Sequence, residues 1–61
     1  MKYNELIRIL KSHGCYDTGK QQKGHPVWFS PITGTQFRLS NHGKQEVATG
    51  TLKSILKMAG I

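Results

Sequence analysis

The stretch GHPVWFSPITGTQFRLS, residues 24–40, decides the fold because two runs of alternating residues flank a turn. The runs are HPVWFS (25–30) and TQFRLS (35–40), and their alternating apolar residues are Val27, Phe29, Phe37 and Leu39. Such alternation is typical of half-buried strands. Between the runs, PITG (31–34) contains a proline, which fixes its own φ, and a glycine, which permits a positive φ. The stretch therefore predicts an antiparallel hairpin.

The segment before the hairpin predicts a helix and a further strand. Residues 3–13, YNELIRILKSH, place apolar side chains at helical spacing, and Gly14 stands where a helix would stop. From Cys15 to about Gln21 the residues are mostly polar, and we interpret them as a short edge strand.

The segment after the hairpin predicts a second helix. TLKSILKMAGI (51–61) has apolar residues at positions i, i+3, i+4 and i+7, namely Leu52, Ile55, Leu56 and Ala59. Thr49 or Thr51 is the expected N-cap, and Gly60 is the expected stop.

The order α-β-β-β-α predicts an α+β fold with a three-stranded antiparallel sheet and both helices on one face. The residues expected to face the helices are Val27, Phe29, Phe37 and Leu39, and those expected to face solvent are Trp28, Gln36 and Arg38. On an open face, Trp28 beside Arg38 would stack on bases or pack against a protein. The alternative is that Trp28 covers the hydrophobic middle of the sheet.

Length and charge limit the function. The 61 residues suit one domain, residues 1–61, without a large interior cavity. Nine Lys and Arg against three Asp and Glu give a formal charge of +6, which favours a polyanionic partner, most simply nucleic acid, although an acidic protein would suit the same field. Cys15 is the single cysteine, so no internal disulfide forms. No apolar run approaches the roughly 20 residues of a membrane span, and we expect a cytoplasmic protein without cofactor or small-molecule substrate.

Three segments carry a resemblance to a known family. GHPVWFSPITG (24–34) resembles the hairpin of the HicA family of toxin ribonucleases, in which glycine or serine, histidine, two residues and an aromatic precede P-x-T-G. EVATGTLKSILKMAGI (46–61) is similar to the closing signature of that family, and ELIRILKSHG (5–14) is similar to its opening helix. The likeness covers nearly the whole chain, and its specificity comes from the three segments occurring in the right order.

The resemblance implies a fold like that of a double-stranded RNA-binding domain. It also implies an endoribonuclease that cleaves mRNA and is neutralised by a HicB-type antitoxin. The catalytic histidine of the family falls on His25. Gly24 stands where many members have serine, so a role for a serine hydroxyl there does not carry over.

The chemistry required of His25 follows from RNA, which carries its own nucleophile in the 2′-OH. Imidazole exchanges a proton near neutral pH and can assist the attack of that hydroxyl. Cations can hold the phosphate and oppose its developing charge. The residues expected to bind RNA are Lys20, Lys23, Trp28, Arg38 and Lys44. The carboxylates Glu5, Asp17 and Glu46 are scattered and lack the paired spacing of a magnesium nuclease, so we expect no metal.

The orientation of His25 presents a difficulty. Strict alternation places it on the same face as Val27 and Phe29, which we expect to face the helices, unless Gly24 and Pro26 turn the imidazole outward. A lone histidine is more often a hydrogen-bonded structural residue, and the resemblance is what favours catalysis.

Other histidines and other functions stay open. His42 would assist His25 if its loop passed nearby, and phosphate contact or solvation is the simpler interpretation. His13, at the end of the first helix, is a cation that the helix dipole favours. The alternative functions are a non-catalytic double-stranded RNA-binding module and a regulatory protein that binds an acidic partner through the open sheet.

Overall fold

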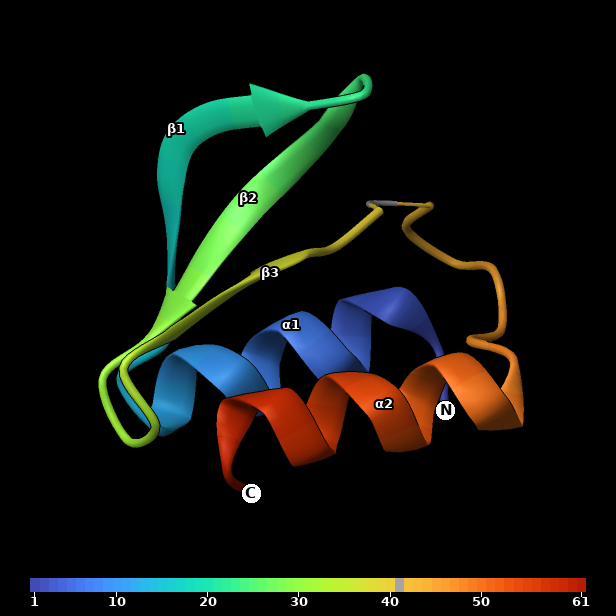
Figure 1. Ribbon diagram of the computed structural model, residues 1–61. Helices are drawn as coiled ribbons and strands as arrows, with labels where there is room; N and C mark the ends of the chain where they lie inside the picture. Colours follow the sequence, from blue (N-terminus) through green and yellow to red (C-terminus); the bar gives the residue numbers. More distant parts are fainter. Residues whose placement is uncertain (41) are drawn as a thin grey trace.

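The computed structural model describes residues 1–40 and 42–61, which form two helices and three strands (Figure 1). The elements are α1 (Tyr3–Ser12), β1 (Tyr16–Gln22), β2 (His25–Ser30), β3 (Thr35–Arg38) and α2 (Thr49–Ala59). The strands pair antiparallel in the order β1-β2-β3, and both helices lie below the sheet in Figure 1. The predicted α+β class and element order are confirmed. Neither of these helices is long and apolar enough to cross a membrane.

Helix α1 forms because its apolar side chains recur on one face. Leu6 and Leu10, one turn apart, are fully buried in the core. Gly14 follows the helix at φ +87°, and the Cys15 N–H donates to the Leu10 carbonyl at 3.0 Å. A glycine in the left-handed region with this bond closes the helix as the sequence predicts.

The register of β2 and β3 decides which side chains enter the core. Trp28 lies opposite Phe37, and both side chains belong to the buried core cluster, with 5% and 3% of their surface exposed. Trp28 therefore faces the helices, and the expectation that it faces solvent is wrong. Alternation places Val27 and Phe29 on the opposite side, so their expected orientation is wrong as well. Leu39 packs in the core with Phe37, as predicted.

The turn between β2 and β3 is fixed by the C-terminal end of α2. The Ser30 hydroxyl donates to the Ala59 carbonyl at 2.7 Å, and the Thr33 hydroxyl donates to the Met58 carbonyl at 2.7 Å. Gly60, at φ +79°, lies so close to the turn that a Cβ there would come within 2.7 Å of the Thr33 methyl group. The turn and the end of α2 thus form one structural unit.

The start of α2 differs from the expectation. Its N-cap is Ala48, whose carbonyl accepts from the Leu52 N–H at 2.8 Å, and no side chain caps the helix. Thr49 is the first residue of the helix and Thr51 is the third, so neither threonine is the N-cap. Gly60 ends the helix, as predicted.

The N-terminus is held against the segment 42–47. The Met1 ammonium group lies 2.8 Å from Glu46 Oε2, and the Val47 N–H donates to the Met1 carbonyl at 2.9 Å. The hydrogen bond and the charge of Glu46 raise the pKa of the Met1 amino group, and the same contacts lower the pKa of Glu46. We call these contacts of Met1 with Glu46 and Val47 the N-terminal clasp. They fix the chain that leads into α2.

Candidate active site

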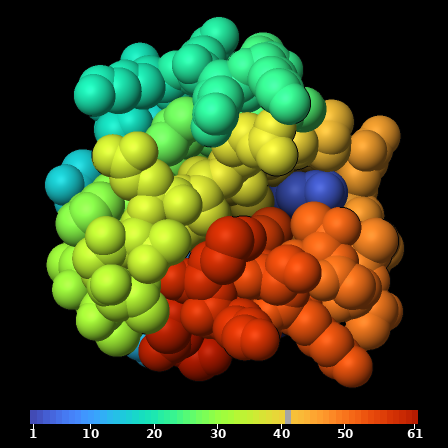
Figure 2. Space-filling view, viewed as in Figure 1, coloured from blue at the N-terminus to red at the C-terminus, as the bar shows by residue number. Residues whose placement is uncertain are grey.

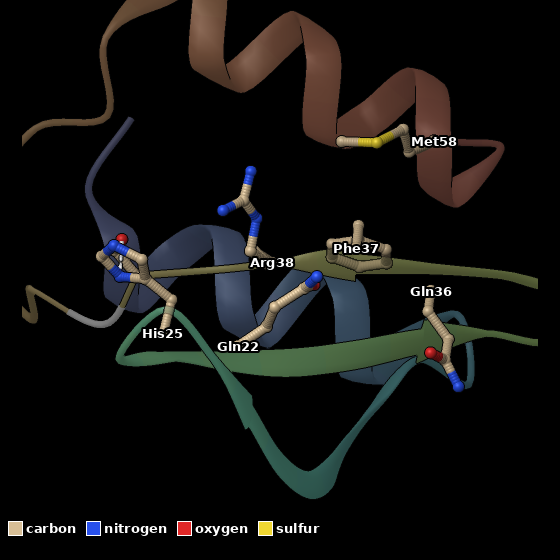
Figure 3. Close-up of a pocket in the computed structure, with 7 residues that line it drawn as sticks. Gln22, His25, Gln36, Phe37, Arg38 and Met58 are labelled. Atoms are coloured by element: carbon tan, nitrogen blue, oxygen red, sulfur yellow. Dashed lines mark hydrogen bonds between the residues drawn. The ribbon is translucent and has the colours of Figure 1, made fainter.

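A pocket of about 450 Å³ is lined by residues of the three strands, of the segment after β3 and of α2. Its lining residues are Gln22, His25, Gln36, Phe37, Arg38, Ser40 and Met58. Figure 2 shows β1 above β3 on this side of the molecule, and α2 below β3. Figure 3 shows His25 at one end of the pocket and Gln36 at the other, with Arg38 between them.

His25 is the first residue of β2, and its side chain is exposed. It shares a face with Val27 and Phe29, and that face points away from the helices. The imidazole therefore reaches the open side of the sheet by ordinary alternation. No outward turn of the imidazole by Gly24 and Pro26 is required.

The turn before His25 explains why glycine precedes it. Gln22 pairs with His25, so Lys23 and Gly24 form a two-residue turn, and their φ values are +53° and +79°. Positive φ at both positions is typical of the type I′ turn, whose second position favours glycine. Gly24 serves the hairpin geometry that delivers His25 to the pocket.

Ser40 is the hydrogen-bond partner of His25. Its Oγ lies 3.0 Å from His25 Nδ1, and it stands two residues beyond the end of β3. Sequence reasoning missed Ser40, and counting outward from the turn at 31–34 would have placed it opposite His25. It also did not assign Gln22, Gln36, Phe37 and Met58 to the site, and these four residues complete the lining of the pocket.

The structure brings only part of the expected RNA-binding set to the pocket. Arg38 lines it beside His25. Lys23 lies in the turn two residues before His25, Lys20 lies in the irregular part of β1, and Lys44 lies in the segment after β3; all three are exposed and none lines the pocket. Trp28 is buried in the core, so in this structure no base can stack on it.

Among the residues that the structure describes, His42 does not line the pocket with His25. Its ring packs edge-on against Tyr3 of α1, with ring centroids 5.2 Å apart and an interplanar angle of 77°. His13 stands at the end of α1, where its Nδ1 lies 2.9 Å from the Ile9 carbonyl. The pocket is thus a site with one histidine among the residues that the structure describes.

The cationic side chains are available to a partner. Within residues 1–40 and 42–61, the one salt bridge joins the Met1 ammonium group to Glu46, and no Lys or Arg side chain takes part in it. Asp17 is occupied locally, because its Oδ1 accepts from the Gly19 N–H at 2.9 Å. The same described residues contain no group of three His, Cys, Asp or Glu side chains placed to hold a metal ion.

Comparison with known proteins places the chain in a family. No curated protein and no solved structure matches the chain. The family model described as the HicA toxin of bacterial toxin-antitoxin systems matches residues 3–61, from the first residue of α1 to the end of the chain. The chain belongs to the HicA toxin family and is a toxin of a toxin–antitoxin system.

Proposed function

We propose that this toxin is an endoribonuclease that cleaves mRNA, with His25 as the acid–base group, and that a HicB-type antitoxin neutralises it. The observation that carries the proposal is the placement of His25 on the open side of the sheet, in one pocket with Arg38. The cationic surface, with a formal charge of +6, suits a polyanionic substrate.

The pocket residues supply what cleavage of RNA needs. His25 removes the proton from a ribose 2′-OH, and the resulting oxygen attacks the adjacent phosphorus. The bond from phosphorus to the 5′ oxygen breaks, and that oxygen takes a proton. The Arg38 guanidinium, with its five N–H donors, is suited to hold the phosphate and oppose the charge that develops on it. Acid–base assistance of this kind typically contributes about 10² to 10⁴-fold in rate.

The test compares the wild-type chain with His25→Ala on RNA in the presence of EDTA. We expect the wild type to cleave without added metal and the variant to bind RNA but leave it intact. Because the 2′-OH is the nucleophile, the wild type should leave a substrate with a single 2′-deoxy position uncut at that position. The control is His13→Ala, which changes a histidine outside the pocket and should cleave normally.

Binding without cleavage by the wild type would contradict the enzyme and favour a non-catalytic double-stranded RNA-binding module. The element order suits such a module, and the exposed Lys53 and Lys57 of α2 would then belong to its contact surface. A melting temperature of His25→Ala close to that of the wild type is needed to attribute its loss of cleavage to chemistry.

Neutralisation is proposed to work by covering the pocket. A site on the surface of so small a chain cannot close over its substrate, so a partner that presents carboxylates to Arg38 and Lys23 would exclude RNA. Hydrogen exchange on the toxin alone and in complex tests this. We expect protection at residues 20–30 and 36–40, with α2 nearly unchanged. Protection confined to 51–59 would contradict covering of the pocket.

A further inference from the structure

Ser40 lies opposite His25 because the ladder between β2 and β3 continues beyond the end of β3. Val27 is paired with Arg38, and the Leu39 N–H donates to the Pro26 carbonyl at 3.0 Å. The next pair in this register is His25 with Ser40. Pairs alternate between those that exchange backbone hydrogen bonds and those that do not, and side chains approach more closely in the second kind. His25 and Ser40 form a pair of the second kind.

The contact between the two side chains is direct. Ser40 Oγ lies 3.0 Å from His25 Nδ1, and Ser40 is half-buried while His25 is exposed. Nε2, on the other side of the ring, makes no hydrogen bond with any residue that the structure describes. The serine therefore engages one nitrogen of the ring and leaves the other to a substrate.

A hydroxyl is suited to this task because it can accept from a ring N–H in both protonation states of the imidazole. When Oγ accepts from Nδ1–H, the neutral ring carries its proton on Nδ1 and its lone pair on Nε2. The imidazolium that follows proton uptake keeps the same Nδ1–H bond. Ser40 then need not move or exchange a proton during the reaction.

We propose that Ser40 is a positioning residue for His25, holding Nδ1–H so that Nε2 is the atom that takes the 2′-OH proton. The inference rests on the proposed ribonuclease function. In the step, Nε2 gains the proton of the 2′-OH, the O2′–P bond forms and the P–O5′ bond breaks. The 5′ oxygen takes a proton from water, and Nε2 later returns its proton to water.

The first measurement is made on the unaltered chain. Nitrogen-15 chemical shifts of the His25 ring, recorded at a pH where the ring is neutral, report which nitrogen carries the proton. We expect the proton on Nδ1 in the wild type and a shift toward Nε2–H in Ser40→Ala. A wild-type ring protonated mainly on Nε2 would overturn the proposal, whatever the variants do.

The second measurement is kinetic and uses matched variants. Ser40→Ala should lower kcat about tenfold, the size of one lost hydrogen bond, with little change in KM. Ser40→Thr keeps the hydroxyl and should restore most of the rate. The control is Ser54→Ala, at an exposed position of α2, which should cleave like the wild type.

These experiments distinguish failure of the role of Ser40 from failure of the proposed function. If His25→Ala abolishes cleavage while Ser40→Ala keeps the wild-type rate and tautomer, the role of Ser40 is overturned and the proposed function stands. If His25→Ala still cleaves, the proposed function is overturned and the catalytic use of Ser40 with it. A parallel fall of kcat in Ser40→Ala and Ser40→Thr, with an unchanged tautomer, would indicate a packing role and overturn the inference.

Discussion

The Ser30 hydroxyl donates a hydrogen bond to the Ala59 carbonyl at 2.7 Å, across 29 residues of sequence. The last carbonyls of a helix have no partner within the helix, and Ser30, whose side chain is fully buried, satisfies one of them from the end of β2. The Thr33 hydroxyl, in the following turn, donates in the same way to the Met58 carbonyl. Two elements of the family resemblance, P-x-T-G and the glycine-terminated last helix, thereby become one packed unit whose role is structural.

Ser30→Ala should lower the free energy of unfolding by about 1–3 kcal/mol, because it leaves a buried carbonyl without a donor. Thr33→Val should have a smaller effect, since the Thr33 side chain is exposed and water can replace its hydroxyl. Urea unfolding followed by circular dichroism measures both. Equal stability of Ser30→Ala and the wild type would show that the hydrogen bond adds nothing to the packing of α2.

Substitution of the glycines at the two ends of α2 should change the stability of the fold in opposite directions. Gly60→Ala should destabilise the fold by about 1–2 kcal/mol, because Gly60 has φ +79° and a Cβ would meet Thr33 at 2.7 Å and Ile32 at 2.9 Å. Gly50→Ala, in the first turn of α2 with nothing within 4 Å of a Cβ, should stabilise it by roughly 0.5 kcal/mol. Thermal melts of the two variants check the signs. Destabilisation by both substitutions would show that the low helix propensity of Gly50 does not limit the stability of the fold.

The burial of Trp28 predicts its spectroscopic behaviour. As the single tryptophan, with 5% of its surface exposed, it should emit at short wavelength and resist quenching by acrylamide, and RNA should leave its emission unchanged. Trp28→Ala should cost about 3–5 kcal/mol of stability, because it empties a core position opposite Phe37. Strong quenching by bound RNA would indicate that Trp28 does reach the open face.

The sequence contains the length of the turn. That length was enough to predict which residues of β2 and β3 share a face of the sheet. Four residues, 31–34, separate Ser30 from Thr35, so counting outward pairs Trp28 with Phe37 and His25 with Ser40. Placing Phe29 on the face of Phe37 would need a turn one residue longer or shorter. The helices and the order of elements were predictable because their patterns are local. The position of Met58 in the pocket was not predictable, because it depends on how α2 packs against the sheet.

The clasp at the N-terminus predicts a pH dependence with a defined sign. Glu46 has a lowered pKa, so its contribution to stability is present above its unfolded pKa and is lost as pH falls through the folded one. The Met1 amino group has a raised pKa, so its contribution is present below its unfolded pKa and is lost as pH rises through the folded one.

The difference in melting temperature between the wild type and Glu46→Gln should therefore be largest near neutral pH and shrink toward acid and toward alkali. The difference should be small throughout, because both groups are exposed and solvent screens the pair. Melting curves at several pH values, at one low ionic strength, measure it. A difference that stays constant with pH would show that the carboxylate charge does not stabilise the clasp.

The position of Arg38 in the pocket predicts how salt acts on RNA binding. Each phosphate that a cation neutralises releases counterions, and the logarithm of affinity then falls linearly with the logarithm of salt concentration. Arg38→Gln should reduce that slope by roughly one unit if the guanidinium holds a phosphate beside His25. The matched control is Lys57→Gln, which removes one exposed charge of α2 that does not line the pocket. Binding of a single-stranded RNA to the catalytically silent His25→Ala background, titrated by anisotropy at several salt concentrations, gives both slopes. An equal reduction by the two variants would mean that RNA senses the overall charge of the chain, and Arg38 would then have no special place at the scissile phosphate.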